Sequence, residues 1–176
     1  MVSTITIRPS SDGYYHDYDP ALPTTHYDRV DEAYRDWVYI SMTGTAWWTD
    51  TFGFTKPTPQ GVIKNITVNA ICIAGGAGNT SYHKAVLYHP DHGVAEGSSQ
   101  YTTVTDPPVY PTLSCDLNPW TSSPWSWDDL DELEFGIRGK CGNVSHIGRC
   151  ELVYMVISWD YPTACGGAQI IGLSDI

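Results

Sequence analysis

Residues 62–73 read VIKNITVNAICI, and this stretch decides the fold class. Its apolar residues Ile66, Val68, Ala70 and Cys72 recur at every second position, with Thr67 and Asn69 on the other face. Successive side chains of a β-strand point to opposite faces, so this pattern places the four on one face. The β-branched content also favours a strand. We therefore expect a long strand with one face in a hydrophobic core.

Other strand candidates lie on both sides of this strand. The strand candidates are residues 4–7, 26–32, 36–40, 47–54, 82–89, 101–105, 135–138 and 149–161. Residues 9–13 are predicted to break the first strand, and residues 14–23 to form a surface loop. About eight short strands separated by turn signals are typical of an antiparallel β-sandwich of jelly-roll type. We assign residues 1–161 to one such domain.

The sequence 118–137, NPWTSSPWSWDDLDELEFGI, carries the main helix signal of the chain. Ser126 is a suitable N-cap, and Asp129 three residues later makes a variant of the capping box. Trp125 and Leu130 occupy the two positions of a hydrophobic staple. We expect one short helix near residues 127–134 that closes one end of the sandwich.

Charge and hydropathy exclude several classes of partner. The 176 residues include only 9 Lys and Arg and carry a formal net charge of −11. Nucleic acids and anionic membranes bind clustered cations, so neither is expected as a partner. The apolar runs are too short to span a bilayer. Residues 1–8 lack the features of a signal peptide, which favours a protein released by lysis or assembly; an extracellular protein whose sequence begins after cleavage is the alternative.

Five cysteines leave at least one thiol without a partner inside the chain. Cys141 and Cys150 flank a polar segment containing glycine that could close as a hairpin. We therefore name these two as the candidate disulfide.

Neither catalysis nor metal binding is predicted. The carboxylates of residues 128–134 lack the spacing of a dedicated Ca²⁺ loop, and those in the first helical turn are explained by the helix dipole. His83, His89 and His92 lie close enough in sequence to share a transition metal, but HPDHG at 89–93 is good turn chemistry. No GxSxG, HExxH or phosphate loop occurs. We assign no catalytic, cofactor-binding or metal-binding residue.

The composition is unusually rich in aromatic residues, with 7 Trp and 12 Tyr. Trp47 and Trp48 are adjacent in a predicted strand, so they must point to opposite faces. Trp120 and Trp125 lie near prolines and are expected at an end of the sandwich. Exposed aromatic rings indicate a partner surface, either another subunit or a sugar stacked on the rings. We name all four as candidate interface residues.

The sequence after residue 161 differs from the domain before it. Residues 162–176 are rich in glycine and contain the apolar side chains Ile170, Ile171 and Leu173. Such a segment is suited to adding a strand to a neighbouring subunit. Its alternative is to fold back over its own sandwich. We treat it as a C-terminal extension and a candidate assembly segment.

The order of these segments resembles a group of β-sandwich proteins encoded by tailed phages, prophages and environmental viruses. The most specific likeness is the family pattern NPxTGxxWTWDDIDxLxxG, matched by residues 118–136. The other matching segments are residues 4–9 with Gly13, and residues 27–32, 36–40, 50–54, 61–70 and 149–161. The resemblance implies a virion structural component without catalytic activity. This chain departs from the family pattern in its cysteines and in the tail after Pro162.

Two functions follow from these observations. The first is a non-enzymatic virion structural protein, such as a capsid decoration, head-fibre or tail component, that contacts copies of itself and other virion proteins. The second is a carbohydrate-binding β-sandwich module of an extracellular or receptor-binding protein, whose partner is a surface glycan. The resemblance favours the first function, and the excess of aromatic residues favours the second.

Overall fold

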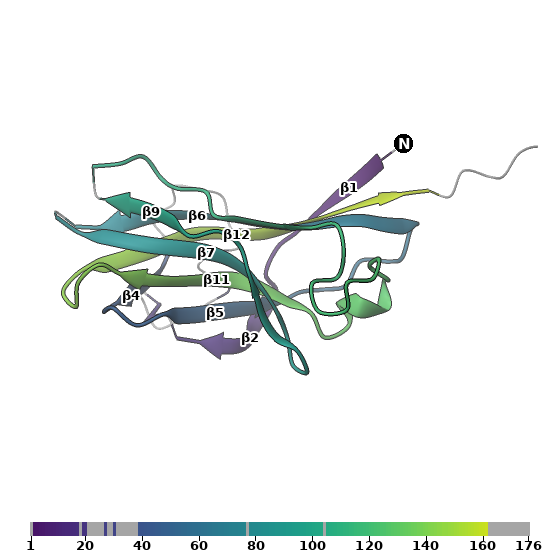
Figure 1. Cartoon of the computed structure of the whole chain (residues 1–176), viewed down its shortest axis with the longest axis horizontal. Helices are drawn as coiled ribbons and strands as arrows, with labels where there is room; N and C mark the ends of the chain where they lie inside the picture. The colour runs from purple at the N-terminus through teal and green to yellow at the C-terminus, as the bar shows by residue number, and fades with distance from the viewer. Residues whose placement is uncertain are drawn as a thin grey trace, which may run out of the picture.

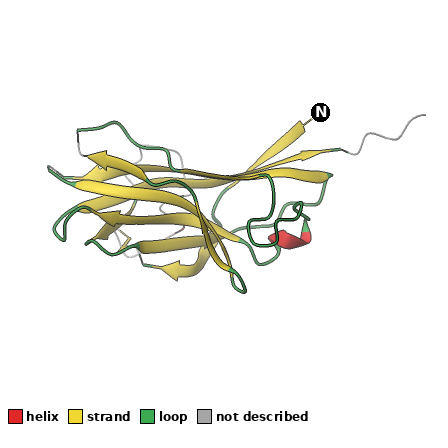
Figure 2. Ribbon diagram, viewed as in Figure 1, coloured by secondary structure: helices red, strands yellow, loops and turns green. Residues whose placement is uncertain are grey.

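The computed structural model describes residues 2–161, with the exception of residues 18, 21–26, 28, 29, 31–38, 77 and 104. Two antiparallel sheets face each other across one core (Figures 1 and 2). The predicted all-β sandwich is therefore confirmed for the described part of the chain. No helix among these residues is long and apolar enough to cross a membrane.

The first sheet, sheet A, is built on two strands of 14 residues each. Its order is β10 (Thr112–Cys115), β6 (Val62–Gly75), β12 (Ile147–Asp160), β4 (Ile40–Thr43) and β3 (Asp19–Pro20). Farther along β12, the edge that pairs with β4 pairs with β1 (Val2–Ile7), in the register Val2↔Asp160 to Ile7↔Met155.

The second sheet, sheet B, has β11 at its centre. Its order is β2 (Ser11–His16), β5 (Trp48–Gly53), β11 (Glu134–Cys141), β7 (Thr80–His89) and β8 (Gly93–Glu96), with β9 (Gln100–Thr103) on the same edge of β7 as β8. In the orders β1-β12-β6-β10 and β5-β11-β7-β8, strands from the first half of the chain alternate with strands from the second half. This alternation is the arrangement of a jelly roll.

The core lies between the two sheets. Ile66, Val68, Ala70 and Cys72 of β6 are all at most 1% exposed, as the alternation in residues 62–73 predicts. Sheet B contributes the buried side chains Phe52, Leu87, Phe135 and Ile137 to the same cluster.

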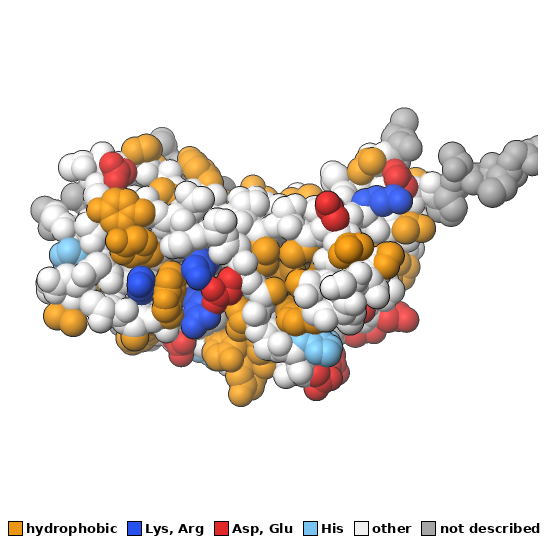
Figure 3. All heavy atoms as spheres, viewed as in Figure 1, with side chains coloured by type: hydrophobic (Ala, Val, Ile, Leu, Met, Phe, Trp, Pro, Cys, Tyr) orange, Lys and Arg blue, Asp and Glu red, His pale blue; other side chains and the backbone are white. Residues whose placement is uncertain are grey.

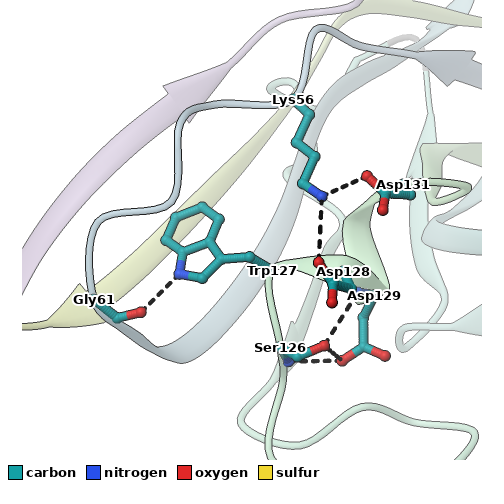
Figure 4. Close-up of polar contacts among 7 residues, drawn as sticks. All are labelled: Lys56, Gly61, Ser126, Trp127, Asp128, Asp129 and Asp131. Atoms are coloured by element: carbon teal, nitrogen blue, oxygen red, sulfur yellow. Dashed lines mark hydrogen bonds and ion pairs between the residues drawn. The ribbon is translucent and has the colours of Figure 1, made fainter.

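The helix predicted over residues 127–134 is wrong in length. This stretch forms one 3₁₀ turn, Asp128–Leu130, and β11 already begins at Glu134. The capping box itself forms: the Asp129 N–H donates to Ser126 Oγ at 3.2 Å, and the Ser126 N–H donates to Asp129 Oδ2 at 2.6 Å (Figure 4). Only three residues separate the turn from β11, so the chain has no room for a second turn.

The turn closes one end of the sandwich, as expected (Figure 2). Leu130 and Trp125 are 2% and 3% exposed and belong to the core cluster. The indole N–H of Trp127 donates to the Gly61 carbonyl at 2.7 Å, and Lys56 pairs with Asp131 (Figure 4). These contacts attach the turn to the loop before β6.

The predicted disulfide between Cys141 and Cys150 is not formed. Both cysteines are buried free thiols, as are Cys72 and Cys115. Cys141 ends β11 in sheet B, whereas Cys150 lies in β12 of sheet A, so the segment between them crosses from one sheet to the other instead of closing a hairpin. The cross-strand neighbour of Cys150 is Cys72.

Residues 11–16 form strand β2, where the sequence predicts a break and a loop. The pairing of β2 with β5 is interrupted between Asp12 and His16. Gly13 lies at this irregularity, where a Cβ atom would come within 2.6 Å of the Thr51 carbonyl. In the sequence, Gly13 indicated the end of a strand. In the structure, it allows β2 and β5 to approach each other closely. Most of the predicted strands 26–32 and 36–40 lies outside the described residues.

Candidate functional site

The outer face of sheet B gathers aromatic rings and cations. Alternation along β7 and β11 sends Ala85, Phe135 and Ile137 into the core, so every second residue points away from it. The outward-facing set includes Tyr82 and Lys84 on β7, and Arg138 and Lys140 on β11. These four are cross-strand neighbours in the register Arg138↔Lys84 and Lys140↔Tyr82. Figure 3 shows the Lys and Arg side chains beside hydrophobic ones over these strands.

Trp47 lies among these cations. The Nζ atoms of Lys84 and Lys140 are 4.6 and 5.0 Å from the centroid of its ring, and the Cζ atom of Arg138 is 5.8 Å from it. These distances are in the range of cation–π contacts. Trp48 instead packs against the core. The expectation that the two tryptophans point to opposite faces is thus confirmed.

Two tyrosines extend the aromatic surface beyond Trp47. Tyr82 of β7 and Tyr101 of β9 are directly opposite in the ladder, with ring centroids 5.1 Å apart. Tyr101 is 49% exposed. The Nζ atom of Lys140 lies 5.5 Å from the Tyr82 ring as well. Trp47, Tyr82 and Tyr101, with the three cations, form what we call the aromatic–cation face.

One carboxylate lies within this face. Glu96 of β8 accepts from Lys84 at 2.6 Å and also pairs with Arg138. Burial alone would raise the pKa of Glu96, but the hydrogen bond from Lys84 and the positive charge of Arg138 lower it below its ordinary value of 4.5. Glu96 thus pairs with two of the three cations, and the face carries a positive excess.

A shallow depression of about 250 Å³ lies at the edge of the face, lined by Asp17, Ala46, Trp47 and Trp48. Asp17 is fixed at its rim, because its Oδ2 accepts from the Thr49 N–H at 2.9 Å and its own N–H donates to the Thr49 carbonyl at 3.0 Å. The depression therefore combines indole rings with a positioned hydrogen-bond acceptor.

A second group of rings lies farther along the same sheet. Tyr14, Tyr15 and Tyr88 have ring centroids 4.9–5.2 Å apart. Glu134 supports the group, since its Oε2 accepts from the Tyr14 N–H at 2.8 Å. Tyr14 is 66% exposed, so this group also presents a ring at the surface.

The other candidate interface residues have different positions. Trp125 is buried and its indole N–H donates to the Cys115 carbonyl at 3.0 Å, so its prediction as an interface residue is wrong. Trp120 is half-buried against the core, with its ring 5.9 Å from His92. Ile170, Ile171 and Leu173 lie outside the described residues.

One mixed cluster of metal-ligating types occurs in the described part of the chain. Single ligand atoms of His89, Asp91 and Glu132 lie within 4.8 Å of one another. The sequence analysis weighed the histidines and the carboxylates of residues 128–134 as two separate groups. The fold brings one member of each together, His89 and Glu132, because the turn after β7 lies beside the segment before β11. Asp91 and Glu132 are exposed, and exposed acidic groups are common without an ion, so the cluster assigns no metal by itself.

Sequence reasoning missed Tyr82, Tyr101 and all three cations of the aromatic–cation face. The available signal is the alternation Tyr82, Lys84 in β7 and Arg138, Lys140 in β11, which places each pair on one face. Only the strand register shows that both pairs surround Trp47, because that register cannot be read from the sequence.

No protein-family model and no curated protein matches this chain. Among solved structures, the xylan-binding module CBM15 aligns over 93% of this chain and 100% of its own, with 13% identity and a TM-score of 0.49. A family 16 carbohydrate-binding module aligns over 70% of this chain and 79% of its own, with 10% identity and a TM-score of 0.39. The tripod from the baseplate of bacteriophage Tuc2009 aligns over 90% of this chain and 61% of its own, with 12% identity and a TM-score of 0.33. At these values the likenesses identify neither the family nor the ligand of this chain.

Proposed function

We propose that this chain is a non-enzymatic carbohydrate-binding β-sandwich that holds a glycan on the aromatic–cation face. The observation that carries the proposal is the open array of Trp47, Tyr82 and Tyr101 beside a shallow depression with a fixed carboxylate. The weakly positive C–H groups of a sugar ring pack well on the negative face of an aromatic ring. Polar groups at the edge of such a site fix the orientation of the ligand.

Tyr101 is the side chain that tests this proposal most directly. It lies on the short edge strand β9 and is half exposed, so removing its ring leaves the core intact. Tyr101→Ala should weaken glycan binding at least about 10-fold, which corresponds to about 1.4 kcal/mol. The measurement is binding to an array of neutral and acidic polysaccharides, followed by calorimetry on the best ligand.

Tyr110 provides the matched control. It is 61% exposed and follows Val109, which pairs with Cys72 of sheet A, so it lies away from the aromatic–cation face. Tyr110→Ala should bind as the parent does. Equal losses in the two variants, or no binding to any polysaccharide of the array, would contradict the proposal.

A role as a virion structural subunit is the second proposal. The likeness of residues 118–136 to a segment of phage β-sandwich proteins favours it, and this segment supplies the 3₁₀ turn that closes the sandwich. A structural subunit should assemble with copies of itself, whereas a binding module needs no such contact. The two proposals are compatible in a virion protein that recognises a surface glycan.

A further inference from the structure

The cations of this acidic chain are unevenly distributed. The chain has 20 Asp and Glu against 9 Lys and Arg, yet three of those cations contact the single ring of Trp47. Exposed charges interact over roughly 8–10 Å at physiological ionic strength, so a ligand on this face experiences these three charges more than the distant acidic surface. With the carboxylates of Glu96 within the face and Asp17 at its edge counted against these three cations, the local charge is still positive, opposite in sign to the net charge.

We infer that the ligand of the aromatic–cation face is an anionic saccharide, one whose sugar rings carry carboxylate or sulfate groups. This inference rests on the proposed carbohydrate-binding function. The aromatic rings alone would suit any sugar. The cations around them add a requirement that a neutral sugar does not meet, because Glu96 pairs with only two of the three, and Lys140 has no carboxylate partner among the described residues.

Lys140 is the cation that remains available to a ligand. Glu96 already holds Lys84 and Arg138. No carboxylate in the described part of the chain pairs with Lys140, whose Nζ lies 5.0 Å from the Trp47 ring and 5.5 Å from the Tyr82 ring. The two rings thus hold an ammonium group beside the surface on which a sugar would stack. A carboxylate or sulfate on that sugar would form a charge-assisted hydrogen bond with it.

Lys84 and Arg138 have a different part in this arrangement. Their shared partner Glu96 fixes them across β7 and β11, and the lowered pKa of Glu96 keeps that carboxylate ionised at neutral pH. They are positioning residues that flank Trp47, and they add positive potential without needing a ligand to satisfy them. Substituting Lys140 therefore removes the available charge with the least disturbance of the face.

The test compares polygalacturonate with the same polymer after reduction of its carboxyl groups, and dextran sulfate with dextran. The variant is Lys140→Met, which keeps the apolar part of the side chain and removes the charge. The matched control is Lys64→Met on β6 of sheet A, where Lys64 lies 3.9 Å from the Asp160 carboxylate and is half exposed. Melting temperatures of both variants establish that each is folded.

We expect the parent to bind at least one of the two charged polymers about 10-fold more tightly than its neutral counterpart, and to lose this preference as salt is added. Lys140→Met should weaken binding of that charged polymer about 10-fold while leaving the neutral one unchanged, and Lys64→Met should change neither. Preference for polygalacturonate identifies a carboxylate as the recognised group, and preference for dextran sulfate identifies a sulfate.

The inference is wrong if charged and neutral polymers bind equally, or if Lys140→Met binds as the parent does. In either case carbohydrate binding that is lost in Tyr101→Ala would still support the proposed function. Single-stranded DNA bound as tightly as the charged polysaccharides would also overturn the inference, because it would make the face a general polyanion site. Failure to bind any polymer would overturn the proposed function as well.

Discussion

At the scale of single residues, His83 is the most unusual side chain of the core. It is fully buried, and its Nε2 lies 2.8 Å from Ser81 Oγ. Its Nδ1 has no hydrogen-bond partner in the described part of the chain. Burial lowers the pKa of His83 from 6.5 to about 3. The histidine is therefore neutral in the folded protein at pH values well above 3.

This burial makes stability depend on pH. The unfolded chain binds a proton at His83 near pH 6.5, whereas the folded chain does so only near pH 3. The contribution of neutral His83 is thus complete above pH 6.5 and is lost as the pH falls toward 3. The loss approaches about 1.4 kcal/mol per pH unit, and on the order of 5 kcal/mol across the window.

The prediction is that His83→Gln flattens the dependence of unfolding free energy on pH between 6.5 and 5, where few carboxylates titrate. Denaturant unfolding followed at several pH values measures this slope. The exposed His92 provides a control, since His92→Gln should keep the slope of the parent. A slope that His83→Gln leaves unchanged would mean that His83 is not the group responsible.

At the scale of elements, the two longest strands were predicted from the sequence, β6 by its alternation and β12 by its apolar run. β6, β7, β11 and β12 each bury every second side chain over part of their length, so their sequences record the face that meets the core. β2 was missed because its glycine serves a close contact with Thr51, and because its outward tyrosines carry no apolar alternation. The disulfide was wrong for a similar reason: Cys141 and Cys150 are near in sequence but belong to opposite sheets.

The candidate site was predicted only in part, for the same physical reason. Trp47 stood out because two adjacent tryptophans cannot both face the core. Its partners Lys84, Arg138 and Lys140 come from strands more than 35 residues further along, and only strand register brings them to the ring. The helix was overextended because its capping signals are local, and a single turn satisfies them.

The 3₁₀ turn gives a prediction at this scale. Leu130 is 2% exposed in the core cluster, so Leu130→Ala should destabilise the protein by about 2–5 kcal/mol. Ser126→Ala removes the acceptor of the Asp129 N–H and should cost about 1 kcal/mol. Asp128→Ala is the control, since that side chain is 97% exposed and should change stability by less than about 0.5 kcal/mol. Thermal unfolding measures all three, and an unchanged melting temperature in Leu130→Ala would show that the turn has no structural role.

At the scale of the whole molecule, one end of sheet A extends beyond the body of the sandwich (Figure 1). Here β12 ends between its two neighbours, with Asp160 paired to Val62 of β6 and to Val2 of β1. Both edges of the final strand are thus occupied at its last residue. The pairing of β12 is therefore complete without the residues after 161.

The last prediction concerns residues 162–176, whose Ile170, Ile171 and Leu173 lie outside the described residues. Leaving such side chains in water forfeits about 1.5–3 kcal/mol for each one that could be buried. If the segment adds to the sheet of a neighbouring subunit, the full chain should be oligomeric, because the main chain supplies affinity and alternate side chains supply specificity. Deleting residues 163–176 should then give a folded monomer.

Light scattering and thermal unfolding of the two proteins separate this exchange from its alternative. A segment that folds back over its own sandwich would stabilise the single chain, so its deletion would lower the melting temperature and leave the oligomeric state unchanged. Ile171→Asp in the full chain tests the same contact without shortening it, because a charge cannot enter an apolar pocket without a large desolvation cost. This variant should be monomeric and as stable as the truncated chain. Assembly that survives both changes would show that the subunits meet elsewhere, and the edge strands β10 and β2 would then be the surfaces to test.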